Sequence, residues 1–367
     1  MIISQTPLRI SFLGGGTDYP EHFLSHGGAV LGTAVDKFAF FSMSRFYSAL
    51  FDYSIRISYR QVECVRSLDE IQHAPFRECL RSAGPNRDVE INHTAELPAF
   101  TGLGSSSSFV VGLLHTIHAY QGRIVSPMEL AYEAIEMERD ILRESVGCQD
   151  QVFAAVGGFN LIEFRGREDF VVHPVALSER RQKDFDDHLL VFFTGLRRRA
   201  GSFAARHVER VSQNVRRLTT LRAMVDEGFR ILTGPGDLDA FGDVLHRTWV
   251  AKRLLDPRIS NAALDSVYEA GLEAGALGGK LLGAGGGGFF LFFVPPENQR
   301  SVRHRLRHLQ EIPLNTNAPG SRIILGDPSE TTKHSLPRRK RARLRSVNAA
   351  GHHSGRWAGH PATACPA

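Results

Sequence analysis

The chain has 367 residues, of which 42% are apolar and 23% charged, a composition typical of a soluble globular protein with one large core or two. No segment approaches the roughly 18 uninterrupted apolar residues of a membrane helix, and the start MIISQTPLRI lacks a secretory signal, so we expect a cytoplasmic protein with no membrane partner. The net charge of +5 is concentrated from Asp327 onward, where 8 Lys and Arg face 2 Asp and Glu. The remainder therefore carries −1 and gives no reason to expect a nucleic-acid surface.

The first half of the chain is expected to mix strands with helices. Apolar or alternating segments predict strands at 29–35, 38–46, 53–59, 89–94, 159–164 and 189–194. Helices are expected at about 106–120 and 127–142. The second begins with Ser126, Pro127 and Glu129, which combines a capping-box spacing with proline at the first helical position.

The second half is expected to be helical from about 201 to 274, then to form a strand at 289–294, a helix at 301–309 and a strand at 322–325. Strands mixed with helices, rather than strictly alternating with them, indicate an α+β fold. Residues 327–367 include PRRKRARLR and few large apolar side chains, which predicts a disordered basic tail. A nucleic-acid arm is the alternative reading of this tail.

The sharpest motif is PAFTGLGSSSS at 98–108, which leads directly into an apolar helix. Glycines let backbone N–H groups turn inward, and the helix start adds unpaired N–H groups and a positive dipole end, so the segment predicts an anion site. A flexible linker is the alternative, but linkers do not usually run straight into a buried helix. The expected phosphate contacts are Gly102, Leu103, Gly104, Ser105, Ser106, Ser107 and Ser108.

Two further glycine-rich segments carry weaker signals. The segment GGKLLGAGGGG at 278–288 contains a formal GxGxxG, but an apolar strand follows where a dinucleotide site needs a helix, and Lys280 lacks the next Ser or Thr of a P-loop. It therefore predicts a backbone that approaches a neighbour very closely, or else a tight turn. The segment RISFLGGGTDY at 9–19 places three glycines between Arg9 and Asp18, which also suits a close backbone approach.

In this order, the three segments resemble the three motifs of the GHMP kinases (galactokinase, homoserine kinase, mevalonate kinase and phosphomevalonate kinase). TPLRISFLGGGTDY resembles the substrate-side first motif, PAFTGLGSSSS the phosphate-binding second motif, and KLLGAGGGGF the third. Within this superfamily, SQTPLR, GGGTD, VGCQDQVFAAVGGFN and a TW-x-x-KR stretch are most similar to D-glycero-D-manno-heptose 7-phosphate kinases. The resemblance covers residues 6–289, nearly the whole chain before the tail.

The resemblance implies an N-terminal ribosomal-S5-domain-2-like unit at 1–195 and a C-terminal ferredoxin-like unit at 196–326, with the active site between them. It implies a sugar kinase that uses ATP and Mg²⁺, with the anomeric 1-hydroxyl of a heptose 7-phosphate or related sugar as the acceptor. An L-fucose- or galactose-type kinase and a non-catalytic sensor that binds ATP and sugar stay open as alternatives. The oligomeric state also stays open, a homodimer included.

Two charged residues are expected to carry the chemistry. Asp150 matches the family's catalytic aspartate and is expected to act as general base, or at least to orient the attacking hydroxyl. The alternative is an N-cap for residues 151–156. Arg9 occupies the basic position of the first motif, where its permanent charge could hold Asp150 ionised and neutralise the transferred phosphate.

Glu138 interrupts the apolar stripe of the helix expected at 127–142. A buried carboxylate is costly unless it is paired or bound to a metal. The resemblance implies that Glu138 is a magnesium ligand, with Ser106 or Ser105 completing the site. A salt bridge to a nearby arginine is the alternative.

The sugar is expected to contact the first and third motifs, with Asp18 accepting hydrogen bonds from its hydroxyls. The expected substrate contacts are Arg9, Gly15, Gly16, Thr17, Asp18, Gly285 and Gly286. A sugar phosphate would also need a cationic pocket, for which Arg198, Lys252 and Arg253 are candidates. Each of these three is alternatively a solvated surface charge.

Overall fold

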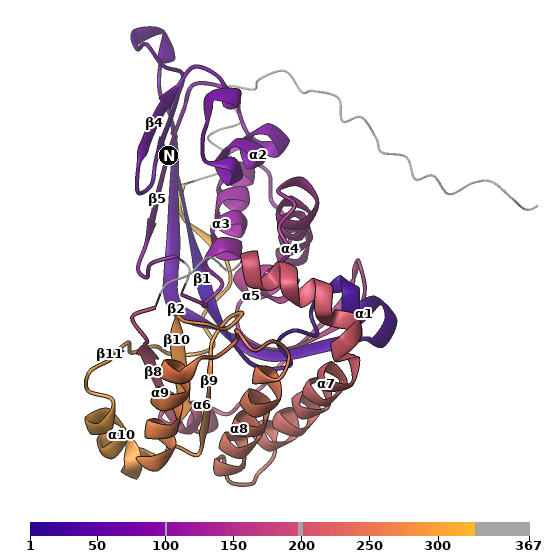
Figure 1. The fold of residues 1–367 in the computed structure, drawn as a ribbon. Helices are drawn as coiled ribbons and strands as arrows, with labels where there is room; N and C mark the ends of the chain where they lie inside the picture. Colours follow the sequence, from indigo (N-terminus) through magenta and orange to yellow (C-terminus); the bar gives the residue numbers. More distant parts are fainter. Residues whose placement is uncertain (100, 197–200, 327–367) are drawn as a thin grey trace, which may run out of the picture. The chain divides into compact units, whose positions relative to one another are not determined.

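The computed structural model describes residues 1–99, 101–196 and 201–326 (Figure 1), and for residues 201–205 and 207 it describes the helical backbone only. The tail predicted at 327–367 and Arg198 lie outside the described residues. Within the described part of the chain, no helix is both long and apolar enough to cross a bilayer.

The larger of two sheets has eight strands in the order β12-β1-β2-β5-β3-β4, with β6 paired to β2 and β7 paired to β6. All pairs are antiparallel except β3 with β5. The strands are β1 (Ile2–Leu13), β2 (Gly28–Arg45), β3 (Ile55–Ser58), β4 (Val62–Val65), β5 (Val89–Ala95), β6 (Phe159–Gly166), β7 (Asp169–Pro174) and β12 (Arg322–Leu325). The strands predicted near 53–59, 89–94, 159–164 and 322–325 are confirmed.

One strand prediction in this sheet is wrong. Residues 29–35 and 38–46 are not two strands but parts of the single 18-residue strand β2. Asp36 and Lys37 form a bulge, because β2 pairs with β1 on both sides of them. The uninterrupted strand can then pair with β6 at its start and with β5 at its end, which joins the two halves of the sheet.

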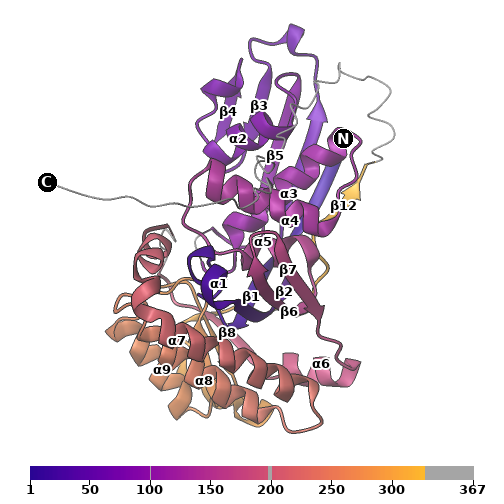
Figure 2. The same ribbon diagram turned by 90° about the vertical axis from the view of Figure 1, so that its right-hand side faces the viewer.

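Helices cover one face of this sheet (Figures 1 and 2). In this half of the chain the helical segments are α1 (Pro20–His26), η1 (Ser48–Leu50), η2 (Leu68–Glu70), α2 (Ala74–Ala83), α3 (Ser105–Tyr120), α4 (Pro127–Glu136), η3 (Met137–Ile141) and α5 (Gln149–Val156). The covering helices are α2, α3, α4 and α5. Apolar side chains surround α3 on most sides, as its sequence predicts, and the structure packs it against β1 and β2.

The helix predicted at 127–142 is confirmed at its start and changes character near its end. The Ser126 hydroxyl accepts a hydrogen bond from the backbone N–H of Glu129 at 3.2 Å, so the predicted cap is present. After Glu136 the chain continues as the π-helical segment η3, which carries Glu138. Wider π-helical turns occur often at functional sites.

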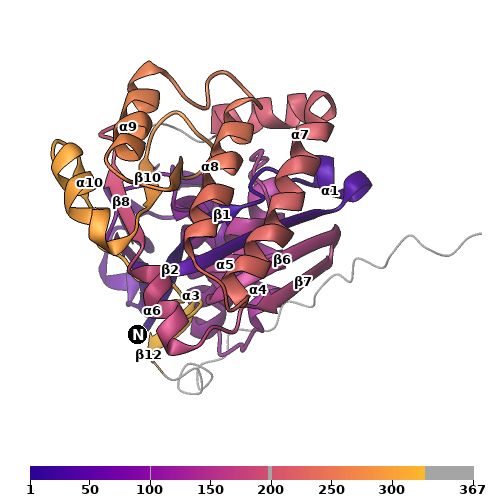
Figure 3. The ribbon, with the colours of Figure 1, turned by 90° about the horizontal axis from the view of Figure 1, so that it is seen from below.

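The second sheet has four antiparallel strands in the order β11-β8-β10-β9. Its strands are β8 (Leu189–Phe193), β9 (Gly278–Leu281), β10 (Phe289–Phe293) and β11 (Gln310–Glu311). The helices of this half are α6 (Glu179–Asp186), α7 (Gly201–Thr233), α8 (Asp239–Arg253), α9 (Ala262–Glu273), η4 (Pro296–Asn298) and α10 (Gln299–Arg305). Every residue of β10 is buried, as its continuous apolar run predicts, and α7 lies beside α8, which packs against β9 (Figure 3).

One strand on each side of residue 195 belongs to the sheet that is formed mainly by the other half of the chain. β8 precedes this position and belongs to the four-stranded sheet, whereas β12 pairs with β1 in the eight-stranded sheet. The described residues share one compact unit. The domain boundary predicted at 195 therefore stays a prediction.

Candidate active site

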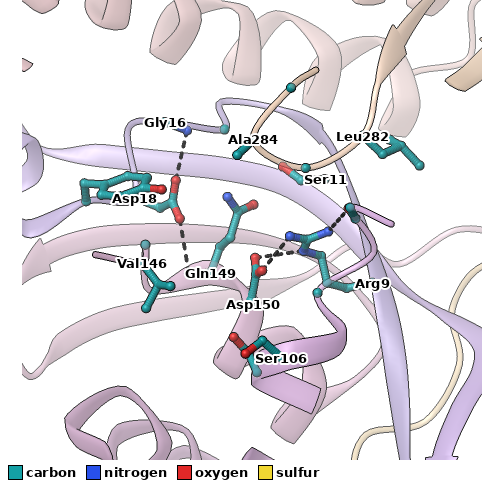
Figure 4. A pocket seen from close by; sticks show the side chains of 18 of the residues that line it. Arg9, Ser11, Gly16, Asp18, Ser106, Val146, Gln149, Asp150, Leu282 and Ala284 are labelled. Carbon is teal, nitrogen blue, oxygen red and sulfur yellow. Dashed lines mark hydrogen bonds and ion pairs between the residues drawn. The ribbon is translucent and has the colours of Figure 1, made fainter. Parts of the chain in front are cut away.

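A pocket of about 590 Å³ gathers the three glycine-rich segments (Figure 4). Its walls come from β1 and the following loop, from the start of α3, from the segment before α5, from α8 and the loop after it, and from the loop between β9 and β10. The sequence therefore predicts correctly that these three segments meet, although more than 250 residues separate the first from the third.

The second motif forms one wall of this pocket. Gly102 and Gly104 have φ values of 89° and 74°, the left-handed region that favours glycine, and Gly104 is the N-cap of α3. The first N–H groups of a helix have no acceptor within that helix, so this turn is suited to an anion. The predicted contacts that line the pocket are Gly102, Gly104, Ser105, Ser106 and Ser107.

Two predicted phosphate contacts do not line the pocket. Leu103 is fully buried in the hydrophobic core. The hydroxyl of Ser108 donates a hydrogen bond to the Pro7 carbonyl oxygen at 2.7 Å, which anchors α3 to β1. Both residues support the loop, and neither presents its side chain to a ligand.

The third motif packs directly on the backbone of the second. A Cβ added at Gly283 would lie 2.6 Å from the Cα of Gly102, and one added at Gly288 would lie 2.3 Å from the Thr101 carbonyl oxygen. Both glycines also have positive φ. The close backbone approach expected from this sequence is therefore confirmed. The neighbour that it approaches is the second-motif loop at Thr101–Gly104, which we call the phosphate-type loop.

Arg9 and Asp150 form a bidentate ion pair inside the pocket (Figure 4). The Nε and Nη2 atoms of Arg9 donate to the two carboxylate oxygens of Asp150 at 2.8 and 2.5 Å, and Nη1 donates to the Gly102 carbonyl oxygen at 2.7 Å. Arg9 is 5% exposed. The guanidinium thus links the carboxylate to the phosphate-type loop.

The capping alternative for Asp150 is wrong. Helix α5 begins at Gln149 with Cys148 as its N-cap, so Asp150 lies one residue inside the helix. Its carboxylate is directed to Arg9 instead of capping the helix.

Glu138 is fully buried at the base of the second motif. Its Oε2 accepts a hydrogen bond from Gln151 Nε2 at 2.5 Å. Burial raises the pKa of Glu138 to about 8, and the hydroxyl of Ser107 and the Gln151 amide counteract part of this rise. Within the described residues Glu138 forms no ion pair, so the salt-bridge alternative is wrong there, and its Oε1 makes no regular hydrogen bond.

These features fit a divalent cation. An unsatisfied buried carboxylate oxygen on a side chain that also interacts with the Ser107 hydroxyl is the kind of oxygen site that Mg²⁺ accepts, with water and substrate phosphates as further ligands. The described residues hold no group of three or more His, Cys, Asp or Glu side chains arranged around one point. A cation here would therefore depend on Glu138, a serine hydroxyl and the phosphates of a nucleotide.

The opposite side of the pocket is built around Asp18, which is 1% exposed. Its carboxylate accepts hydrogen bonds from the backbone N–H groups of Gly16 at 2.9 Å and Gln149 at 3.4 Å. A Cβ at Gly147 would lie 2.0 Å from Asp18 Oδ2, so any side chain there would have to displace the Asp18 carboxylate. Gly15 and Gly16 line the pocket, whereas the hydroxyl of Thr17 donates to backbone oxygens away from it.

The basic candidates separate into two groups. Lys252 lines the pocket, and its Nζ donates to the Gly283 carbonyl oxygen at 2.6 Å. Arg253 does not line it, because its guanidinium pairs with Asp265 at 2.9 Å and lies over the Trp249 ring. Gly285 is at the pocket wall, but its neighbour Gly286 is not.

Sequence reasoning missed a number of pocket residues, among them the polar Ser11, Gln149 and Lys280. Lys280 is 1% exposed, and its Nζ donates to the carbonyl oxygens of Ser11 and Phe12, each at 2.7 Å. Burial lowers the pKa of Lys280 well below its usual range. The only sequence signal was a lysine within an apolar run, and it served merely to exclude a P-loop.

The pocket combines three features: a loop at a helix start that can hold phosphate, an ion-paired aspartate beside it, and a polar wall opposite. Together they are typical of a small-molecule kinase site. Family models agree with this class: the GHMP kinases N terminal domain matches residues 71–158, and the GHMP kinases C terminal domain matches residues 225–311. The chain belongs to the GHMP kinases, phosphotransferases that act on a hydroxyl group and use ATP as donor.

Individual relatives agree with this assignment. The chain is 26% identical over 319 residues to the D-glycero-alpha-D-manno-heptose 7-phosphate kinase of Campylobacter jejuni, covering 84% of this chain and 94% of that protein. It is 25% identical to the galactokinase of Thermococcus kodakarensis, with coverages of 76% and 85%. The structure of a D-glycero-D-manno-heptose 1-phosphate kinase from Bacteroides thetaiotaomicron superposes with a TM-score of 0.73 at 21% identity, covering 89% of this chain and 99% of that one.

Proposed function

We propose that this protein transfers the γ-phosphoryl group of ATP to the anomeric hydroxyl of a heptose 7-phosphate or a related sugar. The observation that carries the proposal is the Arg9–Asp150 ion pair, which lies in the pocket between the phosphate-type loop and the Asp18 wall. The similarity to a heptose 7-phosphate kinase over most of both chains supports the choice of sugar.

In the proposed reaction, the ATP phosphates bind the backbone N–H groups of residues 102–107, and the sugar lies against Asp18. Asp150 accepts the proton of the sugar hydroxyl as that oxygen attacks the γ-phosphorus. The bond from the γ-phosphorus to the β–γ bridging oxygen breaks, and ADP leaves with its electron pair. Arg9 keeps the carboxylate in place and lies close enough to Gly102 to offset the charge of the transferred group.

Glu138 would hold the Mg²⁺ ion together with a serine of the second motif. The Ser107 hydroxyl interacts with the Glu138 carboxyl group, and Ser105 and Ser106 line the adjacent pocket. When bound, the ion would offset the negative charge of the ATP phosphates. Binding requires Glu138 to be deprotonated, so the cation must outweigh the burial that now favours the protonated form.

Lys252 is the candidate for holding the phosphate of a phosphorylated sugar, since it lines the pocket and carries a charge. Arg253 is committed to Asp265 and is no longer proposed for this role. A kinase for an unphosphorylated sugar such as galactose or L-fucose would need no such group.

The test is ADP release measured with ATP and Mg²⁺ across a panel of sugars that includes D-glycero-D-manno-heptose 7-phosphate, galactose and L-fucose. We expect the largest kcat/KM with the heptose phosphate. Turnover of an unphosphorylated sugar alone would keep the kinase and remove Lys252 from phosphate binding. ATP binding without turnover of any sugar would contradict the proposal and favour a sensor.

A further inference from the structure

Among the described residues, two buried polar atoms in the pocket wall have neither a hydrogen-bond partner nor an ion pair: Ser11 Oγ and Gln149 Oε1. A third buried atom there, Asp256 Oδ2, forms no hydrogen bond but pairs with Arg206. Ser11 and Gln149 both line the pocket, and Gln149 is 8% exposed. A buried acceptor without a partner typically costs about 1–3 kcal/mol. Unsatisfied polar atoms are rare in folded proteins, and one aimed into a pocket indicates a ligand that completes the hydrogen bond.

The backbone holds both side chains in place. Ser11 lies on β1 opposite Gly32 of β2, and the Ser11 carbonyl oxygen accepts a hydrogen bond from Lys280. Gln149 begins α5, and its backbone N–H donates to Asp18. The backbones are fixed in this way, and the burial of Gln149 restricts the conformations that its side chain can adopt.

Gly15 lies next to both side chains. A Cβ added there would be 3.4 Å from Ser11 Oγ and 3.8 Å from Gln149 Nε2, which are ordinary contact distances. Gly15 is not among the glycines with positive φ. Alanine should therefore be tolerated by the fold, yet its methyl group would occupy the space beside the two polar side chains. Figure 4 shows Gln149 between Asp18 and Asp150, with its amide extended toward Ser11.

We propose that Ser11 and Gln149 form a subsite that binds hydroxyl groups of the sugar beside the one that is phosphorylated. This inference rests on the proposed function and deepens it. Gln149 Oε1 can only accept a hydrogen bond, so it needs an O–H or N–H donor, which a fully ionised phosphate lacks. A sugar hydroxyl donates to the amide oxygen and accepts from the amide N–H or from the Ser11 hydroxyl. Gln149 and Asp150 both line the pocket and lie side by side in Figure 4, so the hydroxyl that Gln149 binds lies next to the hydroxyl that is phosphorylated.

The test uses Gln149→Met, Ser11→Ala and Gly15→Ala, with the exposed Gln310→Met as matched control. Binding of each panel sugar to wild type and variants is measured by calorimetry, and KM and kcat are measured for the sugar that binds best. We expect each pocket variant to weaken sugar binding and to raise the sugar KM by about 10-fold. The KM for ATP should stay within about twofold, and Gln310→Met should match wild type.

A second readout separates recognition from a structural role. Ser11→Ala and Gln149→Met remove unsatisfied buried acceptors, so without sugar their melting temperatures should equal or exceed that of wild type. Unchanged sugar affinity in both, or weaker affinity accompanied by a clear loss of stability, would overturn the subsite. The subsite would also be overturned if the wild-type protein bound none of the sugars in the panel. Sugar binding without phosphoryl transfer would instead contradict the kinase and leave the subsite supported.

Discussion

At the scale of single residues, the ion pair between Arg9 and Asp150 makes the sharpest prediction. Asp150→Asn keeps the shape of the side chain but removes its charge and its ability to take a proton. We expect kcat to fall by about 10²–10⁴-fold, while ATP affinity changes little. Single-turnover ADP release and fluorescent-nucleotide binding measure the two effects. A variant with nearly normal kcat would exclude Asp150 as the base.

The buried carboxyl group of Glu138 predicts a pH effect on stability. Burial raises its folded-state pKa to about 8 from an ordinary value of 4.5, so the folded protein binds a proton that the unfolded chain has released. The contribution of this protonation to the free energy of unfolding is fully present below pH 4.5. It is lost as the pH rises from 4.5 toward 8. Without divalent cations, the melting temperature should fall over this range more steeply in wild type than in Glu138→Gln.

Magnesium supplies the control for this prediction. Since the cation needs the carboxylate form, added Mg²⁺ with nucleotide should raise the wild-type melting temperature more at pH 8 than at pH 5.5. The Glu138→Gln variant should lack this difference. Identical pH profiles and identical responses to Mg²⁺ would mean that Glu138 does not bind the cation.

The basic residues at the end of α8 predict a difference in substrate preference. Lys252→Met should raise the KM for a phosphorylated sugar by about 10-fold or more but have a smaller effect with an unphosphorylated one. Arg253→Met, whose partner is Asp265, should change neither KM. Steady-state kinetics with both kinds of sugar decide this, and an equal loss in the two variants would contradict the assignment of Lys252.

Sequence patterns predict residues whose role depends on local spacing and miss those whose role depends on tertiary contacts. Asp150 and Glu138 are predicted because a family motif and a broken apolar stripe mark them. Gln149 and Lys280 lie within the family-like segments VGCQDQVFAAVGGFN and KLLGAGGGGF, but the sequence assigns neither of them a role. An amide beside a catalytic position and a lysine in an apolar run each have many ordinary explanations. Their roles follow only from the contacts with Asp18 and with β1.

At the scale of elements, the contact between the two glycine-rich loops predicts a steric cost. Gly283→Ala combines a φ of 73° with a clash against Gly102, whereas Gly195→Ala has a similar φ of 76° and no heavy atom of the described residues within 4 Å. We expect Gly195→Ala to cost about 1 kcal/mol from the backbone alone and Gly283→Ala about 3 kcal/mol or more. Denaturant unfolding measures both, and equal costs would contradict the close contact.

Elements follow from the sequence where periodicity is local. Helix α3, strand β10 and the cap of α4 agree with their predicted positions. The sequence does not predict β1, because its residues do not alternate regularly between buried and exposed positions. The bulge at Asp36 and Lys37 resembled a turn, because two adjacent charged residues interrupt the apolar pattern whether or not the strand continues.

At the scale of the whole molecule, the last strand predicts the effect of truncation. Removing residues 327–367 leaves β12 in place, so kinase activity should be unchanged, and any nucleic-acid binding that the basic tail provides should be lost. Removing residues 322–367 also removes β12, which pairs with Ile3, Ser4 and Gln5 of β1. We expect this second truncation to lose about 2–4 kcal/mol of stability and to aggregate with increasing concentration. Equal melting temperatures for the two truncations would show that β12 adds nothing.

The whole fold was predictable as a class and not as a strand order. The resemblance gave an α+β kinase with its site between two units, and both family domains match. It did not reveal that β8, which lies in the unit predicted at 1–195, belongs to the four-stranded sheet. Nor did it reveal that β12, which lies in the unit predicted at 196–326, belongs to the eight-stranded sheet. Pairing partners of short strands depend on the register of distant segments, which a single sequence does not encode locally.

The pairing of β12 with β1 also has a consequence for protein synthesis. Strand β1 leaves the ribosome about 300 residues before its outer neighbour β12 is made, an interval of roughly 15–60 s at ordinary rates of translation. During that interval β1 has an open edge that another nascent chain could join. Slower translation of the second half should therefore lower the soluble yield of the full-length protein. Supplying the β12 sequence as a peptide during synthesis should restore part of that yield.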